Sequence, residues 1–586
     1  MGGDHYALLQ VDRAAARRGL RTMTAMTLQQ AVEHVTTTNP TFAMTTATIR
    51  GVEFRVFENI PQTVGSLLRA SWAPMGEGAA EYLVFDDERW TFSEFCDDVK
   101  AMAHVLQHDL GVNQGDRVAI AMRNYPELMV LMMAITSVGA VIVFVNAWWT
   151  TEELDYALRD SAPSLVFADG PRAERIAPLI EPLNLTVVGV RDGEVTADKS
   201  YTSLRDSAKG ADWPDVSVDN DDDFAVMYSS GTTGRPKGVV LTHRGAVNAV
   251  FSWLMQAVIA PLMDPPAPDA PEAARPSVLV ATPLFHVTAT HPVFLLSLPA
   301  GAKVALIPKW DPENAAQIIQ DHKITRLLGV PTQSADLMQT AKRLGLTLPT
   351  LDYVGAGGAK RPPVQVAQLA ETFPNANIAT GWGMTETNAL GIGMIGQEYV
   401  DRPDAAGRLH PPLQEIKLLD EDGAEVPMGE PGEITVKSPS NMRCYLNKPD
   451  ATAEVLQDGW LRTGDMGVID AEGYVTIVDR KKNIIIRGGE NIACLDVEAA
   501  IHRHPDVIEA CAFSVPDERL GEIVGASIHL RDGANLDSDA MRAFLDGHLA
   551  HFKIPNHLWF QTDALPRGAT DKLDRRGVRT ACLETL

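Results

Sequence analysis

The sequence predicts an α/β protein with a large N-terminal region of layered α/β subdomains and a small α+β domain at its C-terminus. The chain has 586 residues, more than one compact core supports, so two or more domains are expected. Its composition, 45% hydrophobic and 22% charged, is typical of a soluble globular protein. Strand-like segments alternate with helix-like ones from Thr45 to about Val240, which is typical of parallel sheets covered by helices.

The predicted strands of the large region are short and apolar. They cover residues 82–85, 117–121, 164–168, 185–190, 224–228, 277–281, 303–307, 326–329 and 351–354. Residues 432–436 and 474–478 are more typical of hairpin strands. Residues 263–276, rich in Pro, Ala and Asp, predict a surface loop.

A smaller unit is predicted after Lys482, with helices at 494–502 and 538–549 and strands at 507–515 and 523–530. The charged, turn-like stretch 479–483 marks the boundary. We therefore divide the chain into an N-terminal extension (1–44), a large domain (45–481) and a C-terminal domain (482–586). The extension is rich in Arg, Ala and Thr, and we expect it to be loose.

The uncharged run 128–151 is long enough to span a bilayer. However, Pro126-Glu127 is typical of a helix start, Gly139 divides the run, and residues 141–145 are β-branched and strand-like. A buried helix followed by a buried parallel strand explains the run better than a transmembrane segment. The N-terminus has no apolar core of a secretory signal.

The net charge limits the partners that are expected, and the cysteines indicate the redox compartment. The net charge of −25 argues against nucleic acid or anionic membranes, so a nucleotide site must be locally basic. The five cysteines form no C-x-x-C pair and no zinc pattern, which fits structural thiols in a reducing cytoplasm. The sequence is compatible with a homodimer and does not determine the oligomeric state.

One polar loop has the composition of a polyphosphate site. It is Tyr228-Ser-Ser-Gly-Thr-Thr-Gly-Arg-Pro-Lys-Gly238, and it follows the predicted strand 224–228 and precedes a helix-like run. Glycines let the backbone approach a ligand, while hydroxyls, amides and an ammonium bind phosphate. The order differs from a Walker A loop, because Gly238 follows Lys237 where Ser or Thr is required. A plain Gly/Ser linker is the alternative.

Five further segments follow the loop in order. They are Pro283-Leu-Phe-His-Val287, Gly355-Ala-Gly-Gly-Ala359, Gly381-Trp-Gly-Met-Thr-Glu386, Gly459-Trp-Leu-Arg-Thr-Gly-Asp465 and Asp479-Arg-Lys-Lys-Asn-Ile-Ile-Ile-Arg-Gly-Gly-Glu-Asn491. The missing side chains of the Gly355–Ala359 segment open space, either for close packing or for a flat ring. Trp382, flanked by glycines, is suited to lie along a nucleobase, Glu386 is suited to Mg²⁺, and Asp465 to a ribose diol. Each segment alone is explained by a turn or a solvated face; together they are specific.

With these segments the chain resembles the acyl-adenylate-forming superfamily, which contains acyl-CoA synthetases, adenylation domains of peptide synthetases and luciferases. The resemblance extends from about Phe57 to about Arg576. It implies a large N-terminal AMP-binding domain and a small mobile C-terminal domain. It also implies ATP, Mg²⁺ and coenzyme A as substrates and cofactor.

The resemblance assigns roles to individual residues. The phosphate loop contains Ser229, Ser230, Gly231, Thr232, Thr233, Gly234 and Lys237. The adenine site is formed by Gly358, Ala359, Gly381, Trp382 and Gly383. Thr385 resembles the phosphate ligand, Glu386 the Mg²⁺ ligand, and Asp465 and Arg480 the ribose-holding pair.

The resemblance also assigns the moving parts. Lys482 is at the family's hinge, and Gly488 and Gly489 resemble the lining of the pantetheine channel. His286 resembles the gate between the acyl and thiol tunnels. The segment Pro566-Arg-Gly-Ala-Thr-Asp-Lys572 makes Lys572 the adenylation lysine.

Two positions depart from the family pattern. Trp382 replaces a usual Tyr, which keeps the flat face and loses a phenolic hydroxyl. Asp571 replaces the Gly that usually precedes the lysine, and its carboxylate can pair with Lys572 or alter the local backbone.

The resemblance implies an ATP-dependent, AMP-forming carboxylic acid:CoA ligase acting on a medium- or long-chain fatty acid or a bulky cyclic acid. The segments around His286 are apolar, poor in bulk and free of a placed Asp or Lys. Three alternatives stay open: a stand-alone acyl-AMP ligase that loads a carrier protein, a non-catalytic nucleotide-binding relative, and a P-loop kinase or ATPase. The chain ends soon after Lys572, so a fused carrier domain is not expected.

Overall fold

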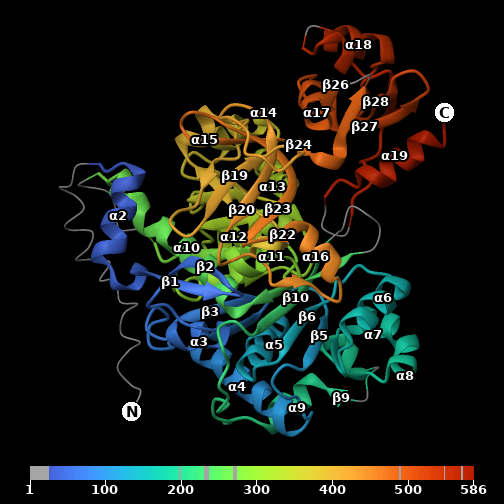
Figure 1. Ribbon diagram of the computed structural model, residues 1–586. Coiled ribbons are helices and arrows are strands. Elements are labelled where there is room, and N and C mark those ends of the chain that lie inside the picture. Colours follow the sequence, from blue (N-terminus) through green and yellow to red (C-terminus); the bar gives the residue numbers. More distant parts are fainter. Residues whose placement is uncertain are drawn as a thin grey trace.

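The computed structural model describes residues 25–195, 197, 199–229, 236–267, 274–487, 490–546, 548–568 and 572–586. Figure 1 shows a large body that contains most of the chain and a smaller C-terminal unit that stands at one side of its top. This arrangement matches the predicted fold class.

One sheet of the large body has eight strands in the order β21-β11-β10-β6-β5-β7-β8-β9. Strands β10 to β9 in this order are parallel, and β11 and β21 are added antiparallel at one edge. The strands are β5 (Arg117–Ala121), β6 (Val141–Phe144), β7 (Leu165–Ala168), β8 (Thr186–Gly189), β9 (Lys199–Ser200), β10 (Asp223–Ser229), β11 (Lys237–Thr242) and β21 (Cys444–Tyr445).

A second sheet has nine strands in the order β18-β17-β16-β15-β14-β12-β13-β3-β4, and its inner strands are parallel. The strands are β3 (Glu81–Phe85), β4 (Glu88–Thr91), β12 (Ser277–Val280), β13 (Lys303–Leu306), β14 (Arg326–Gly329), β15 (Tyr353–Ala356), β16 (Asn377–Trp382), β17 (Ile392–Ile395) and β18 (Arg408–Leu409). The strand expected at 351–354 therefore lies two residues later in the chain.

The two sheets share one hydrophobic layer because side chains alternate along each strand. Val118 and Ile120 of β5 point into the same core as Leu83 and Phe85 of β3. The helices in this shared layer are α3 (Val64–Ala70), α4 (Phe92–His108), α5 (Pro126–Ser137) and α10 (His243–Met263).

The outer faces of the two sheets are covered by further helices. The eight-stranded sheet packs there against α6 (Thr151–Ser161) and α7 (Gly170–Ile176). The nine-stranded sheet packs against α12 (Pro312–Asp321), α13 (Pro331–Leu344), α14 (Pro363–Thr372) and α15 (Gln397–Asp401). Shorter helices connect the strands: α8 (Ile180–Leu183), α9 (Tyr201–Ser207), α11 (Val287–Ala289) and α16 (Pro449–Val455).

The uncharged run folds as predicted, into the buried helix α5 and the buried strand β6. A different helix, α10, is long and apolar enough to cross a membrane by length and composition. Its apolar side chains, among them Val250, Phe251 and Met255, are buried in the layer between the two sheets, which explains its composition.

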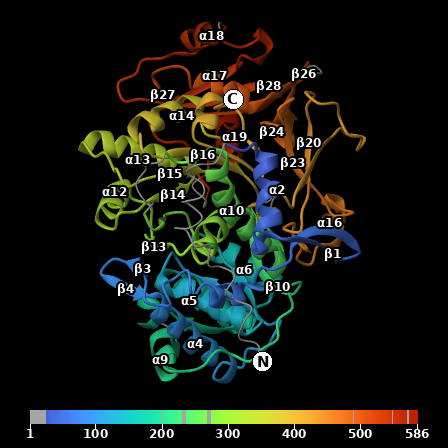
Figure 2. The same cartoon turned by 90° about the vertical axis from the view of Figure 1, so that its left-hand side faces the viewer.

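Residues just before the first strands are folded, contrary to the loose extension we expected. Helix α2 (Leu28–Thr38) starts at Thr27, whose side chain and that of Gln30 cap its first turn reciprocally. Ala31 and Val35, one turn apart, are buried, and α2 lies along α10 (Figures 1 and 2). These two apolar residues are a weak helix signal in a Thr-rich stretch, so the sequence pattern did not predict α2. Residues 1–24 lie outside the described residues.

Two antiparallel groups complete the large body. β1 (Met44–Ile49) and β2 (Val52–Phe57) form a hairpin. A five-stranded sheet contains β19 (Glu415–Leu419), β20 (Gly432–Lys437), β22 (Leu456–Gln457), β23 (Trp460–Ile469) and β24 (Val475–Arg480). The chain then passes through η7 (Lys481–Asn483), where we place the domain boundary.

The C-terminal unit has its own sheet and its own cores. The strands are β25 (Ile484–Arg487), β26 (Glu490–Ala493), β27 (Val507–Asp517), β28 (Gly521–Leu530) and β29 (His557–Gln561). Helices α17 (Cys494–Ile501) and α18 (Ser538–Asp546) pack on one face and α19 (Arg575–Leu583) on the other.

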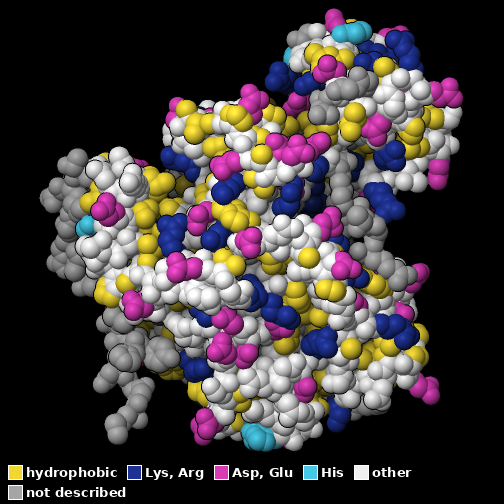
Figure 3. Space-filling model, viewed as in Figure 1, with side chains coloured by type: hydrophobic (Ala, Val, Ile, Leu, Met, Phe, Trp, Pro, Cys, Tyr) yellow, Lys and Arg dark blue, Asp and Glu magenta, His cyan; other side chains and the backbone are white. Residues whose placement is uncertain are grey.

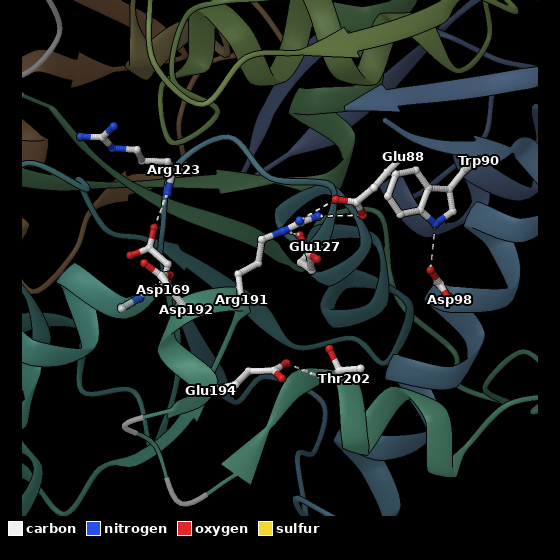
Figure 4. Close-up of polar contacts among 11 residues, drawn as sticks. Glu88, Trp90, Asp98, Arg123, Glu127, Asp169, Arg191, Asp192, Glu194 and Thr202 are labelled. Atoms are coloured by element: carbon white, nitrogen blue, oxygen red, sulfur yellow. Dashed lines mark hydrogen bonds and ion pairs between the residues drawn. The ribbon is translucent and has the colours of Figure 1, made fainter. Parts of the chain in front are cut away.

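Arg191 joins the two large sheets at their edge (Figure 4). It follows β8 with φ of 53°, and its guanidinium bonds Glu88 at 2.6 and 3.1 Å and Glu127 at 3.0 Å. It also lies 4.9 Å from the ring centroid of Phe85. Burial raises the pKa of Glu127, and the charge of Arg191 opposes that rise.

We expect Arg191→Met to lower the free energy of unfolding by about 1–2 kcal/mol, because it leaves the mostly buried Glu127 carboxylate without its cation. The loss should shrink at acid pH, where a protonated Glu127 needs no cation. Arg343→Met is the control, since Arg343 and Glu313 are both more than half exposed and such pairs contribute less than about 1 kcal/mol. Urea unfolding of both variants measures the difference; equal losses contradict the prediction.

Candidate active site

Several of the predicted site residues that the structure describes come together where the C-terminal unit faces the large body. Figure 3 shows a hollow beneath the C-terminal unit, with Lys and Arg side chains along it. The large body contributes the carboxyl ends of β15 and β16 and the start of β11, and the C-terminal unit contributes Lys572. Ligands commonly bind at this end of parallel strands.

The phosphate loop is the connection of a β-hairpin. Ser229, the last residue of β10, pairs with Lys237, the first residue of β11. A strand therefore follows the loop, where the sequence led us to expect a helix; α10 begins only at His243. The short strand β11 directly precedes that helix, so the sequence pattern made strand and helix look like one helical segment. Ser230, Gly231, Thr232, Thr233 and Gly234 lie outside the described residues.

Lys572 reaches across from the C-terminal unit to Gly358. A Cβ added at Gly358 would lie 2.9 Å from Lys572 Cε and 3.2 Å from its Nζ. Gly358 also has φ of +78°, which other residues rarely adopt. Glycine is thus required there for two reasons, the backbone conformation and the lysine above it. Ala359, the next residue, is exposed and lies in the segment that follows β15.

The ammonium of Lys572 lies among charged groups of the large body. Solvent still reaches the side chain, but the surrounding protein strips much of its hydration and lowers its pKa to about 8. Arg480 lowers that pKa further, whereas Asp465 and Glu386 oppose the shift. The lysine is therefore poised to change charge near neutral pH.

Asp465 is held by two donors. It pairs with Arg480 across β23 and β24, and Arg480 Nε lies 2.9 Å from Asp465 Oδ1. The indole Nε1 of Trp382, at the end of β16, donates to Asp465 Oδ2 at 2.8 Å. Asp465 is 4% exposed; burial raises its pKa, which Arg480 and Trp382 pull back. The Trp that replaces the family Tyr thus fixes the carboxylate expected to bind ribose.

Thr385 and Glu386 begin η6 (Thr385–Thr387), just after β16. Glu386 is 5% exposed and accepts a hydrogen bond from Tyr445 Oη at 2.9 Å. The ring of Tyr445 also lies under Lys237, whose Nζ is 4.6 Å from the ring centroid. Sequence reasoning missed Tyr445, which is more than 200 residues from Lys237 and has no local signal.

His286 lies close to the lysine. It precedes α11, and its ring stacks edge-on against Phe285 with centroids 4.5 Å apart. Its Nε2 is buried and has no hydrogen-bond partner. Burial, reinforced by the charge of Lys572, lowers the pKa of His286 to about 3, so the ring is neutral.

Gly383 is required by a close backbone contact. A Cβ at this position would lie 2.2 Å from the carbonyl oxygen of Ala389. Gly383 thus closes the turn from β16 into η6. A Cβ at Gly381 would meet the carbonyl oxygen of Ile392 at 3.7 Å, an ordinary van der Waals distance, so this contact does not require glycine. The position of an adenine ring beside the indole stays a prediction.

Several predicted positions are not placed by the structure. Gly488, Gly489 and Asp571 lie outside the described residues, as does the side chain of Lys482. The thiol channel, the hinge and the effect of Asp571 on Lys572 stay predictions.

The described residues suit a metal that is shared with a substrate. Among them, no group of three or more His, Cys, Asp or Glu side chains is gathered to hold a metal alone. Mg²⁺ is usually held by one or two carboxylates together with phosphates and water. The buried carboxylate of Glu386, hydrogen-bonded through one oxygen, fits that mode of binding.

Two family models match the chain. The model described as AMP-binding enzyme matches residues 71–446, and that of the AMP-binding enzyme C-terminal domain matches residues 496–572. The first match alone covers more than half of the chain.

Named relatives cover most of the chain. A feruloyl-CoA synthase of Amycolatopsis sp is 34% identical over 83% of this chain and 93% of its own length. A long-chain-fatty-acid–CoA ligase of Bacillus subtilis is 31% identical over 88% and 94%. The crystal structure of ATP-bound MatB from Rhodopseudomonas palustris superposes with a TM-score of 0.78 at 26% identity, covering 89% and 99%. The chain belongs to the AMP-binding enzyme family, among the AMP-forming acyl-CoA synthetases.

Proposed function

We propose that this acid–CoA ligase activates a medium- or long-chain fatty acid or a bulky cyclic acid, such as an aromatic one. The family uses ATP, Mg²⁺ and coenzyme A and forms AMP. Membership also sets aside the kinase or ATPase alternative, whose products would be ADP and phosphate. The proposal concerns the acid and the roles of the residues around it.

The uncharged segments around the expected acyl site support an apolar acid. The segments that surround the expected acyl site, 284–298, 355–359 and 387–393, contain no Asp, Glu, Lys or Arg. Amino acids and dicarboxylates carry a second charged group, which is costly to bury without a partner. The names of two relatives, feruloyl-CoA synthase and long-chain-fatty-acid–CoA ligase, agree with a bulky apolar acid.

In the first half-reaction, a carboxylate oxygen attacks the α-phosphorus of ATP, and the bond to pyrophosphate breaks. Two anions must approach, so positive charge is needed between them. We assign this role to the ammonium of Lys572 beside Gly358. We propose that Lys237 binds the pyrophosphate that leaves. Glu386 would hold Mg²⁺ together with the phosphates, and the metal, when bound, would supply further positive charge there.

In the second half-reaction, the thiol of coenzyme A attacks the acyl carbonyl, and AMP leaves. Lys572 has to withdraw, because the nucleophile needs access to the same carbonyl. We assign the withdrawal to a rotation of the C-terminal unit at η7, next to Lys482, in line with the family. The uncharged His286 ring lies beside Lys572 and is the gate that this motion frees.

A panel of carboxylic acids tests the acid class. Pyrophosphate release is measured with acetate, malonate, amino acids, C8–C18 fatty acids and hydroxycinnamic acids, with consumption of free coenzyme A followed in parallel. We expect the highest kcat/KM for a fatty or aromatic acid. Highest activity with acetate, a dicarboxylate or an amino acid contradicts the proposal, and adenylate formation without consumption of coenzyme A favours a carrier-protein acceptor.

Lys572→Ala should separate the half-reactions. We expect acid-dependent pyrophosphate exchange to fall by about 10²–10³-fold, the usual cost of one charge-stabilising donor. Thioester formation from supplied acyl-AMP should change little, because the lysine acts only on the first step.

The pH dependence of adenylation gives a second test of the role of Lys572. A lysine with a pKa of about 8 is protonated below that pH, so kcat/KM for adenylation should decline as pH rises through about 8. In Lys572→Ala that decline should be missing. Equal losses in both half-reactions, or an unchanged pH profile, contradict the role of Lys572.

Trp382→Phe should weaken ATP binding, since the flat ring remains but the N–H donor to Asp465 is lost. We expect the KM for ATP to rise about tenfold, as for loss of a hydrogen bond to a charged group, with the KM for the acid unchanged. Trp460→Phe, a substitution in β23 at a ring that contacts Lys417, is the matched control. If both variants keep the wild-type KM for ATP, the hydrogen bond from the indole to Asp465 has no role in ATP binding.

A further inference from the structure

Tyr445 lies between the phosphate-loop lysine and the metal-binding carboxylate. Its hydroxyl donates to Glu386 Oε1 at 2.9 Å, and Lys237 Nζ lies 4.6 Å from its ring centroid. Tyr445 is 8% exposed and Glu386 is 5% exposed, so both contacts are shielded from bulk water. One side chain therefore contacts two groups that act on the same phosphates.

Strand pairing sets the position of the ring relative to the lysine. In the antiparallel pair of β11 and β21, Tyr445 lies opposite Val239. Side chains two residues apart on a strand share a face, so Lys237 projects on the same face as Val239 and as its partner Tyr445. A further backbone bond, from Leu446 N to Gly238 O at 2.7 Å, fixes this register.

A second backbone contact brings Glu386 to the hydroxyl. Met442 N donates to Glu386 O at 2.7 Å, which holds η6 against the segment that leads into β21. A phenol is protonated at physiological pH, so the Tyr445 hydroxyl is the donor and the Glu386 carboxylate the acceptor of this bond. Among the residues that the structure describes, the carboxylate is thereby held through Oε1.

We propose that Tyr445 is a positioning residue that aligns the Glu386 carboxylate for Mg²⁺ and the Lys237 ammonium for the β- and γ-phosphates. The inference rests on the roles assigned above to Glu386 and Lys237. The hydroxyl orients the carboxylate, as hydrogen-bond partners of metal ligands commonly do. The ring attracts the ammonium through its π face and limits where it points.

The two parts of the side chain act on different quantities and can be separated. Removing the hydroxyl alone affects the carboxylate and therefore the dependence of ATP binding on Mg²⁺. Removing the ring also affects Lys237 and therefore the affinity for ATP without a metal. A merely structural tyrosine produces neither pattern.

The test measures ATP binding by calorimetry across a series of Mg²⁺ concentrations and in EDTA. For Tyr445→Phe we expect the Mg²⁺ concentration that gives half of the metal-dependent gain in affinity to rise about tenfold. The affinity for ATP in EDTA should equal that of the wild type. Tyr445→Leu should also weaken binding in EDTA, by about three- to fivefold.

Tyr474→Phe is the matched control. Tyr474 also donates its hydroxyl to a carboxylate, that of Glu398, but it joins the β23–β24 turn to α15. Tyr474→Phe also deletes a Tyr–Glu hydrogen bond, so it should lower the thermal midpoint about as much as Tyr445→Phe does. It should leave the Mg²⁺ dependence of ATP binding unchanged.

Glu386→Gln separates this inference from the proposed function. If Glu386→Gln leaves the Mg²⁺ dependence unchanged, the metal role of Glu386 is wrong. If Glu386→Gln shifts it and Tyr445→Phe does not, the role of Tyr445 alone is overturned. Weaker binding of Tyr445→Phe in EDTA also overturns the division between hydroxyl and ring.

Discussion

The contact of Lys572 with Gly358 is the constraint on which the rest of the site depends. A flexible side chain from the small unit ends on a glycine turn of the large one, so the charge it delivers exists only in one arrangement of the two bodies. A side chain at position 358 would occupy the space of the lysine. In the role proposed for Lys572, the lysine has to leave this position before the thiol attacks. The proposed two-step reaction would then depend on the division of the chain into two bodies.

Most other groups of the site are positioned by neighbouring strands. Asp465 and Arg480 are cross-strand partners in β23 and β24, and Tyr445 is paired into β11 just after Lys237. A ladder fixes side chains more narrowly than a loop does, because register and face are set by backbone bonds. Trp382 and Glu386, at the end of β16 and just after it, then complete two buried hydrogen bonds to residues far away in the chain.

The sequence predicted the parallel strands well because buried β-branched segments such as β5 and β7 are bounded by clear turns. Its ordered motifs proposed most of the candidate site residues, and the roles of these residues stay predictions. It failed where the signal was not local: helix α2 has only two small buried residues, β11 merges with the helix that follows, and the expected strand at 351–354 was displaced by two residues. Tyr445 could not be found, because its importance comes from register with a strand 200 residues earlier.

The shared hydrophobic layer has a consequence for how the molecule loses its structure. Side chains of both large sheets interdigitate with the same helices, so neither sheet can be exposed without opening the other. The large body should therefore denature as one cooperative unit. The C-terminal unit has separate cores and can loosen by itself. Heat that unfolds the C-terminal unit alone would displace Lys572 from a large body that is still folded. In the role proposed for this lysine, such a protein would keep most of its structure and lose its activity.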